Sequence, residues 1–582
     1  MSKDSMALAA YRDAFADATA PFLTAYRIAA DKSLLPQTWT RGEFWLAARR
    51  IATVLRDHGI GHGDCVTLCL GANHGLDLAT RLAAVMTGAV PVTVNWQADT
   101  AERVVYKVQS TDSRLALLDE AFPAEQLELL RASVPALALV ALADTQAAEP
   151  LAESEFCDAV TADSTRIVIF TSGTTGQPKG VRLPYRAYAT NRATFEQFLQ
   201  VDPAARFGVF IVNPMHHTNS TAITDWAMRR PGSQIHLLER YTTAYWRQLC
   251  ELAESGFDRL VAPAVARHFD FLDGLESAGR LPVPAARLRA AMARVDILIG
   301  SAPVGPTTVK RLQHHSGRVP TVRFGSTETC LQVIGIPPHL DEAARLAAFQ
   351  SGWQHHYDGQ DLCGYYIGRS HSGHTEARVV RSTTPGEAGY MADCAPGEPG
   401  QLVTRGGNLM SGYVGDDEAT RAVFADGWYT GLGDIAFTLT SAADGQPDIY
   451  WLSRSSSLLI RGGANYAYDQ VNAELRAFVQ QHYALESDDV DVAVVGLRVD
   501  SEHEDACCVT LELNGGTTPD QKRHIAATFL DAAAKHVTKG SKPDYVRVAL
   551  IPRNFKGAVL VPDLKAAFTA HLATGDPVAI NA

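Results

Sequence analysis

The segment RIVIFTSGTTGQPKGV, residues 166–181, places a run of small and hydroxyl residues directly after a short apolar stretch. Backbone N–H groups of such a loop can surround an anion, hydroxyl groups add donors, and a lysine adds a positive charge. It is not a Walker loop, because that motif needs a Gly-Lys pair and none occurs in the 582 residues. A plain surface loop is the alternative, but it does not explain this order of residues. We predict a phosphate-binding loop with contacts from Thr171, Ser172, Gly173, Thr174, Thr175 and Lys179.

The segment RFGSTET at 323–329 carries a second group of residues that suits a nucleotide. An aromatic ring can stack on a base, and the glycine after it permits a close approach. A threonine can donate to a phosphate, and a glutamate can hold Mg²⁺ that is shared with substrate phosphates. Alone, such a string is more often a turn. Beside a phosphate loop it favours a nucleotide and Mg²⁺ site made of Phe324, Gly325, Ser326, Thr327 and Glu328, with Glu328 as the metal ligand.

The elements that must position these groups follow an α/β rhythm. Residues 50–95 alternate amphipathic stretches with the apolar segments CVTLCL and AVPVTV, which predicts parallel βαβ units. Gly59, Gly61 and Gly63 precede a strand rather than follow one, so they predict a turn and not a dinucleotide loop. A stretch rich in Gly, Pro, Asp and Ser at 443–457 predicts a boundary, with a large domain at 1–453 and a small domain at 454–582.

Composition narrows the range of partners. The 52 basic and 64 acidic residues give a formal charge of −12, which argues against a broad surface for nucleic acid or anionic lipid. No apolar run is long enough to span a bilayer, and the acidic N-terminal segment does not suit a signal peptide. Nine cysteines without a CxxC pair fit a reducing compartment, so we expect a cytoplasmic protein.

Eight segments in the same order make the chain similar to the adenylate-forming superfamily of acyl-CoA ligases, luciferases and peptide-synthetase adenylation domains. The resemblance covers nearly the whole length, and the segments lie at 59–95, 171–181, 297–304, 323–329, 397–420, 427–437, 453–466 and 551–564. It implies a large N-terminal AMP-binding domain of βαβ subdomains, a small mobile α+β C-terminal domain, and an active site between them. The cofactors it implies are ATP or AMP, Mg²⁺ and coenzyme A.

The resemblance also implies roles for residues that their types alone would not reveal. It places nucleotide contacts at Gly300, Ser301, Ala302 and Pro303, a ribose-binding carboxylate at Asp434, and an arginine on the same sugar at Arg454. The glycines used in thioester formation match Gly462 and Gly463. Near Asp434 the segment GWYTGLGD departs from the usual GWxxTGD and puts Leu432 where threonine is expected, so a polar contact is in doubt.

The acyl side is read from NPMHHTNST at 213–221. The resemblance implies that His217, and His216 on the usual aromatic position, face the acyl pocket. His217 would orient the acyl carbonyl or gate the pocket, and a packed core histidine is the alternative reading. The segment lacks the aspartate that α-amino acid enzymes use for the substrate ammonium, which favours a carboxylic acid without an α-amino group. The pairs His355–His356 and His371–His374 lack a third ligand at helix spacing, so we do not predict a metal there.

The C-terminal tail departs from the family where the chemistry is most sensitive. PRNFKGAVLVPDL, residues 552–564, matches the usual PRNxxGKxxRxxL without a gap, and Ala558 takes the place of the lysine that bridges the carboxylate and the α-phosphate. Loss of one such preorganised donor costs about 3–4 kcal/mol in the transition state. Two residues earlier on the same face, Lys556 could reach toward the site, though with poor preorganisation. The expected hinge reads Ser455, Ser456 and Ser457.

These features predict an acyl-CoA ligase that transfers an acyl group from a bound acyl-adenylate to the CoA thiol, with adenylation impaired or absent. A separate adenylating ligase would then be its partner. The combination resembles the non-adenylating acyl-CoA ligases of platensimycin-type secondary metabolism. Two alternatives stay open: a full two-step ATP-dependent synthetase that uses Lys556 as a catalytic residue, and a regulatory adenylate-binding pseudoenzyme.

Overall fold

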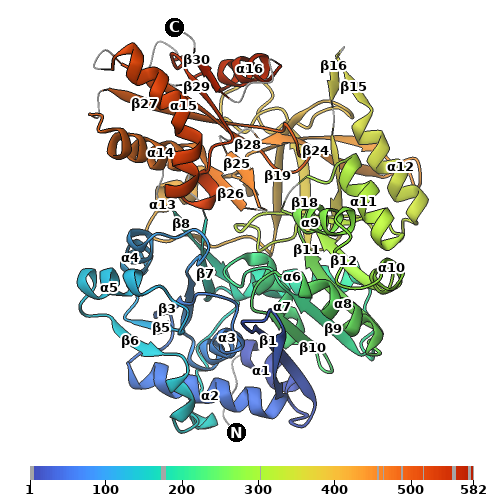
Figure 1. Cartoon of the computed structure of the whole chain (residues 1–582). Coiled ribbons are helices and arrows are strands. Elements are labelled where there is room, and N and C mark those ends of the chain that lie inside the picture. The colour runs from blue at the N-terminus through green and yellow to red at the C-terminus, as the bar shows by residue number, and fades with distance from the viewer. Residues whose placement is uncertain are drawn as a thin grey trace.

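The computed structural model divides into a large N-terminal and a small C-terminal part, each with its own hydrophobic core (Figure 1). It describes residues 6–171, 178–301, 303–358, 360–362, 364–454, 458–462, 464–486, 489–514, 517–553, 559–573 and 578–580. The main core of the large part extends from Leu8 to Trp451, and the core of the small part extends from Leu459 to Phe568. The predicted boundary at 453 and 454 falls between them. The predicted α/β class, with a large and a small domain, is confirmed.

The first sheet of the large domain is mixed. Its parallel part runs in the order β1, β10, β9, β11, β12, β13, flanked by antiparallel β2 on one side and by an antiparallel extension on the other. Short strands such as β9, FGVFI, are buried along their whole length because helices cover both faces. The strands are β1 Pro21–Ile28, β2 Leu34–Thr40, β9 Phe207–Ile211, β10 Gln234–Leu238, β11 Arg259–Ala264, β12 Val295–Ile299, β13 Thr321–Phe324, β14 Ile334–Gly335, β17 Tyr365–Ser370, β18 Thr375–Val380, β19 Gly400–Gly406, β21 Phe424–Ala425, β22 Trp428–Tyr429, β23 Asp434–Thr440 and β24 Pro447–Arg454.

The second sheet has the order β20, β8, β7, β4, β3, β5, β6, and its βαβ units are those predicted from residues 50–95. Gly59 and Gly63 have φ of 69° and 84°, so the predicted turn before β3 is confirmed. The strands are β3 Cys65–Cys69, β4 Val90–Thr93, β5 Leu115–Leu118, β6 Ala138–Ala141, β7 Thr165–Thr171, β8 Lys179–Pro184 and β20 Gly412–Tyr413. A separate pair is formed by β15 His355–Tyr357 and β16 Gln360–Leu362.

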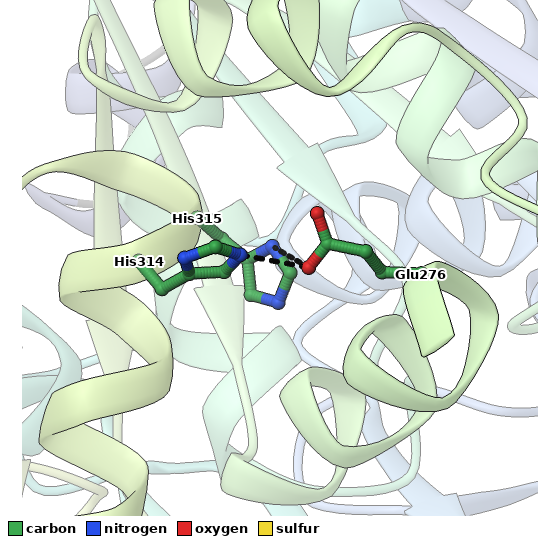
Figure 2. A group of neighbouring side chains, drawn as sticks. All are labelled: Glu276, His314 and His315. Atoms are coloured by element: carbon green, nitrogen blue, oxygen red, sulfur yellow. Dashed lines mark hydrogen bonds and ion pairs between the residues drawn. The ribbon is translucent and has the colours of Figure 1, made fainter. Parts of the chain in front are cut away.

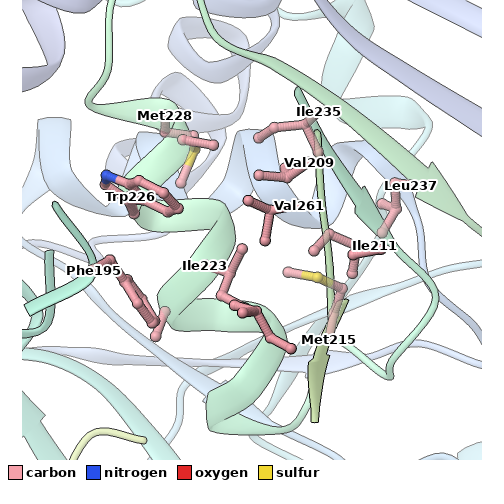
Figure 3. Close-up of a cluster of buried hydrophobic side chains, with 14 of the residues drawn as sticks. Phe195, Val209, Ile211, Met215, Ile223, Trp226, Met228, Ile235, Leu237 and Val261 are labelled. Atoms are coloured by element: carbon pink, nitrogen blue, oxygen red, sulfur yellow. The ribbon is translucent and has the colours of Figure 1, made fainter. Parts of the chain in front are cut away.

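Helices cover these sheets, and two of them, α3 and α7, are buried along their whole length. Figure 3 shows the apolar residues of α7, such as Ile223 and Trp226, packed against Val209, Ile235 and Val261 of the first sheet. The helices of the large domain are α1 Met6–Ala14, α2 Arg41–Asp57, α3 Gly75–Thr87, α4 Ala101–Ser110, α5 Ala124–Ser133, α6 Tyr185–Leu199, α7 Thr218–Met228, α8 Ala244–Glu254, α9 Ala266–Ser277, α10 Ala285–Met292, α11 Pro306–Ser316, α12 Glu342–Trp353 and α13 Asp417–Ala422. In the described part of the chain, no helix has the length and apolarity needed to cross a membrane.

The small domain combines a hairpin, β25 Leu458–Arg461 and β26 Ala464–Ala467, with a four-stranded sheet. That sheet has the order β27 Val490–Leu497, β28 Ala506–Leu513, β29 Tyr545–Val548 and β30 Val578–Ile580, and it packs with α14 Tyr468–Tyr483, α15 Pro519–His536 and α16 Val561–Leu572. Figure 1 shows the hairpin on the side of the small domain that faces the large domain, and α16 with β30 at the opposite end.

Four buried histidines make the stability of the fold dependent on pH. Burial lowers the pKa to about 4 for His217, His236, His268 and His371. In the unfolded chain an imidazole protonates near pH 6.5. Between pH 6.5 and 4 the unfolded state therefore binds more protons than the folded state, and stability falls as the pH falls.

We expect the free energy of unfolding to decrease between pH 7 and pH 5 by about 1–2 kcal/mol for each buried histidine. Urea titrations at both pH values measure this decrease, and His268→Gln should make it smaller. Carboxylates with a lowered pKa, such as Asp270, contribute only at more acidic pH. Equal free energies of unfolding at pH 7 and pH 5 would contradict this account.

Candidate functional site

Three predicted site segments lie at the carboxyl ends of parallel strands in the first sheet. His217 follows β9, Gly300 follows β12, and Phe324 ends β13. Because β12 and β13 are parallel neighbours, their carboxyl ends meet at the same edge of the sheet. Ligands of α/β proteins bind in the crevice at this edge. The structure thus brings together segments that are more than a hundred residues apart in the sequence.

The backbone at this edge is packed too closely for side chains at two glycines. A Cβ on Gly300 would lie 2.9 Å from the carbonyl oxygen of Arg323, and one on Gly325 would lie 1.7 Å from that of Leu331. Three non-glycine residues have left-handed backbones, Ser301 with φ of 70°, Cys330 with φ of 45° and Leu331 with φ of 83°. Such strain concentrates at functional sites, where the surroundings hold the backbone in place.

The 324–329 loop is fixed by its own hydrogen bonds. Thr329 accepts from the backbone N–H of Ser326 at 2.8 Å and donates to the Ser326 carbonyl at 3.1 Å. Asn408 donates to the Thr329 carbonyl at 2.8 Å. Phe324, Gly325, Ser326, Thr327 and Glu328 are all half-buried. These predicted contacts therefore lie on a rigid loop with part of each residue at the surface of the edge.

Tyr413 links the predicted metal ligand to the predicted phosphate loop. Its hydroxyl donates to Glu328 Oε1 at 3.2 Å, and the Lys179 ammonium lies 5.1 Å from the centre of its ring. Burial raises the pKa of Tyr413, and the Glu328 carboxylate raises it further. Since Tyr413 pairs with Val181 of β8, the second sheet is joined here to the end of β13 in the first. Lys179 and Glu328 thus flank one aromatic ring.

Thr171 ends β7 and stands opposite Lys179, the first residue of β8. The chain between these two residues carries most of the predicted phosphate loop. Most of that loop, including Ser172, Gly173, Thr174 and Thr175, lies outside the described residues. The same holds for Ala302, Gly463 and Lys556, and for the sequence features at Ser455–Ser457 and Ala558.

Asp434 and Arg454, predicted on the same sugar, are cross-strand partners in β23 and β24. The Asp434 carboxylate is 2% exposed and accepts from the indole Nε1–H of Trp451 at 2.8 Å. Burial raises the pKa of Tyr429 most, and the charges of Glu328 and, less strongly, Asp434 raise it further. Leu432 is buried, which suits an apolar residue where threonine was expected.

His217 precedes the buried helix α7 and is held by that helix. Burial, together with the charge of Lys107 on α4, lowers its pKa to about 4, so the imidazole is neutral near pH 7. Lys107 forms a buried ion pair with Asp99 at 2.5 Å. The ring of His216 lies 4.4 Å from that of His217, and its nitrogens have no hydrogen-bond partner among the described residues. His217 can thus orient a carbonyl but carries no charge.

Sequence reasoning missed the aromatic residues that connect these groups. Tyr413 and Tyr429 lie in motifs that were recognised, SGYVG and GWYTG, yet neither was assigned a role. Trp451 and the Asp99–Lys107 pair lie outside those motifs. For Tyr413 and Tyr429, the available signal was an aromatic residue in each of two neighbouring family motifs. No signal in the sequence pointed to the Asp99–Lys107 ion pair.

One group of side chains has the composition of a metal site. Figure 2 shows Glu276 of α9 beside His314 and His315 of α11, with ligand atoms within 4.8 Å of one another. His314 Nε2 lies 2.8 Å from Glu276 Oε2, and His315 Nε2 lies 3.3 Å from Asp273. Because the carboxylates already bond both imidazoles, we assign the group to the packing of α9 on α11. The pairs at 355–356 and 371–374 form no such group within the described residues.

These features are typical of a nucleotide-binding enzyme of the α/β class: loops at strand ends, close backbone packing, and acidic and basic groups around Tyr413. Residues 19–414 match the family described as AMP-binding enzyme, and the chain belongs to this family.

Relatives of the chain are CoA ligases. It is 27% identical to the indoleacetate–CoA ligase of Aromatoleum aromaticum, over 80% of this chain and 82% of that one. It is 26% identical to 4-coumarate–CoA ligase 5 of Oryza sativa, over 92% of this chain and 90% of that one. Among solved structures, it resembles a double mutant of the o-succinylbenzoate CoA synthetase of Bacillus subtilis bound with its product analogue OSB-NCoA, with a TM-score of 0.72, 20% identity and coverage of 96% and 98%. The chain is thus a member of the AMP-binding family that is similar to CoA ligases over most of its length.

We expect Asp434→Asn to weaken AMP binding by about 10- to 100-fold, because a neutral amide replaces a charged acceptor for the ribose hydroxyls. The amide oxygen can still accept from Trp451, so the fold should be retained. Isothermal titration with AMP measures the affinity, and the melting temperature without AMP serves as the control. Equal affinities at equal stability would remove Asp434 from the ribose site.

Proposed function

We propose that this chain makes an acyl-CoA thioester from an acyl-adenylate and that its own adenylation step is weak. The CoA sulfur attacks the acyl carbonyl carbon, a C–S bond forms, and the C–O bond to the phosphate breaks. AMP leaves with that electron pair on its phosphate oxygen, and the thiol proton passes to solvent. The observation that carries the weak first step is Ala558 in the position of the family lysine.

The groups at the strand ends fit the nucleotide that this reaction releases. Phe324 offers a partly exposed ring for the base, Asp434 a buried carboxylate for the ribose, and Lys179 a cation for the phosphate. Glu328 would hold Mg²⁺, which supplies charge neutralisation at the phosphates when bound. Structures of the Bacillus subtilis relative are described in complex with AMP and with ATP and magnesium ion, which supports these assignments.

The arrangement of the small domain supports the thioester half of the reaction. The β25–β26 hairpin lies near the large domain, because Glu504 accepts from the Gly462 N–H at 2.6 Å and its carboxylate lies 3.8 Å from Arg267 of α9. The TM-score is 0.72 with the structure of the relative bound to OSB-NCoA and 0.61 with its complex with the acyl-adenylate OSB-AMP. This chain therefore superposes better on the product-analogue structure of that relative.

The flanks of the tail support the same reading. Arg553 pairs with Val559 across the tail segment, and its guanidinium bonds Glu512 at 2.7 Å within the small domain. Figure 1 places α16, which follows this segment, at the end of the small domain away from the large domain. The described residues on either side of the tail segment thus contact the small domain.

The acyl group we propose is a carboxylic acid without an α-amino group. The histidine segment offers no acid for an ammonium, and His217 is neutral. A second ligase would supply the adenylate, as in the non-adenylating enzymes of platensimycin-type pathways. The two-step alternative assigns adenylation to Lys556 instead, and a pseudoenzyme would bind AMP without turnover.

We expect slow ATP–pyrophosphate exchange but rapid CoA-dependent AMP release from supplied adenylates. The adenylates of 2-succinylbenzoate, indoleacetate and 4-coumarate, the acids named for the relatives, form the test panel. Ala558→Lys should raise exchange by about 10-fold or more, because it restores a cation at the α-phosphate.

Lys556→Ala should leave AMP release unchanged, as should the matched control Lys535→Ala at an exposed position of α15. Rapid exchange in the unmodified chain that collapses in Lys556→Ala would establish the two-step enzyme. AMP binding without release from any adenylate of the panel would favour the pseudoenzyme.

A further inference from the structure

Helix α11 begins without a capping side chain of its own. Its N-cap is Gly305, which offers no side-chain hydrogen bond. The first N–H groups of a helix lack intrahelical partners and carry partial positive charge, so they favour a carboxylate. The helix starts three residues after the predicted nucleotide segment 300–303, which makes its N-terminus part of the same edge.

The carboxylate comes from the other domain. Glu502, in the loop between β27 and β28, accepts from the Thr307 backbone N–H at 2.8 Å and from the Thr308 N–H at 3.3 Å. Its second oxygen accepts from the Thr307 hydroxyl at 2.8 Å. A Cβ on Gly305 would lie 2.5 Å from Glu502 Oε2, so the glycine leaves the space in which this carboxylate sits.

The next two residues of the loop extend the contact to α9. His503 is 2% exposed, and its Nε2 lies 2.8 Å from an Asp270 carboxylate oxygen. Its Nδ1 lies 3.4 Å from the Thr308 hydroxyl. The Glu504 carboxylate lies 3.8 Å from Arg267. Three consecutive side chains thus contact two helices of the large domain.

The same loop holds the hairpin that carries the thioester-forming glycines. Glu504 accepts from the Gly462 N–H at 2.6 Å. Asp505 accepts from the Ile460 N–H at 2.8 Å, and its own N–H donates to the Ile460 carbonyl at 2.7 Å. One loop therefore joins the β25–β26 turn to α9 and α11.

We propose that the loop Glu502–Asp505 is an interdomain latch that positions the Gly462 turn for attack by CoA. The inference rests on the proposed function, because it assigns the latched arrangement to thioester formation. Glu502 and His503 fix the small domain on α11 and α9, and Glu504 and Asp505 fix the turn to the same loop. These are positioning residues, since none of them contacts the reacting atoms.

Amide hydrogen exchange on the full chain tests the contact without any substrate. Thr307 and Thr308 should be protected although they lie in the first turn of a helix. Glu502→Ala should speed their exchange by about 10-fold, the size of a lost N-cap. The matched control is Glu128→Ala, an exposed glutamate on α5, which should change neither amide.

Gly305→Ala supplies an independent variant, because its methyl group should displace Glu502. Alone it should reproduce the exchange of Glu502→Ala, and combined with Glu502→Ala it should add little. Additive effects of the two changes, or unprotected amides in the unmodified chain, would overturn the latch.

CoA-dependent AMP release tests the positioning role. Glu502→Ala should lower the maximal rate by about 10-fold, because loss of the cap destabilises the latched arrangement by the free energy of one N-cap. The affinity for AMP should be unchanged. Lost protection with an unchanged rate would overturn the positioning role. Protection that depends on Glu502 in a chain that releases no AMP from any adenylate would support the domain contact and overturn the proposed function.

Discussion

The candidate nucleotide site depends on how closely the ends of β12 and β13 pack. With a Cβ at Gly325 the loop after β13 would collide with the Leu331 carbonyl, and with one at Gly300 the loop after β12 would press on Arg323. This tight packing holds Phe324 and Glu328 at the sheet edge and forces Leu331 into a left-handed backbone. The buried helix α7 fixes the histidine segment after β9 in a similar way, because this segment leads directly into a helix that is packed in the core.

The junction between the domains follows different physics. The two hydrophobic cores stay separate, and the described contacts of the 498–505 loop with the large domain are carboxylate caps, ion pairs and cation–π contacts such as that of Arg498 with Trp451. Polar contacts of this kind are individually weak when partly exposed. A domain held this way can be released without exposing apolar surface, which a shared core would not allow.

Sequence patterns predicted the fold class, the parallel βαβ units and the turn at Gly59, because short-range periodicity and turn chemistry determine them. They also predicted which segments would form a site, and three of these segments lie at the carboxyl ends of β9, β12 and β13. The roles assigned to Asp434 and Glu328 stay predictions. Tyr413 was missed although its motif was recognised. The Glu502 loop could not be found from the sequence, because it acts through contacts between distant segments whose residue types are common on any surface.

Under the proposed function, the tail disfavours adenylation and the latch favours thioester formation. Adenylation needs the tail at the α-phosphate. Because Ala558 offers no charge there, the substrate stabilises that domain arrangement little. Thioester formation needs the hairpin instead, and Glu502 stabilises that arrangement by completing a helix that lacks its own cap. A two-state domain equilibrium shifts toward the state with more favourable contacts. Ala558 weakens the adenylating arrangement, and Glu502 stabilises the thioester-forming one, so both favour the thioester-forming state. This suits an enzyme that receives its adenylate from another ligase.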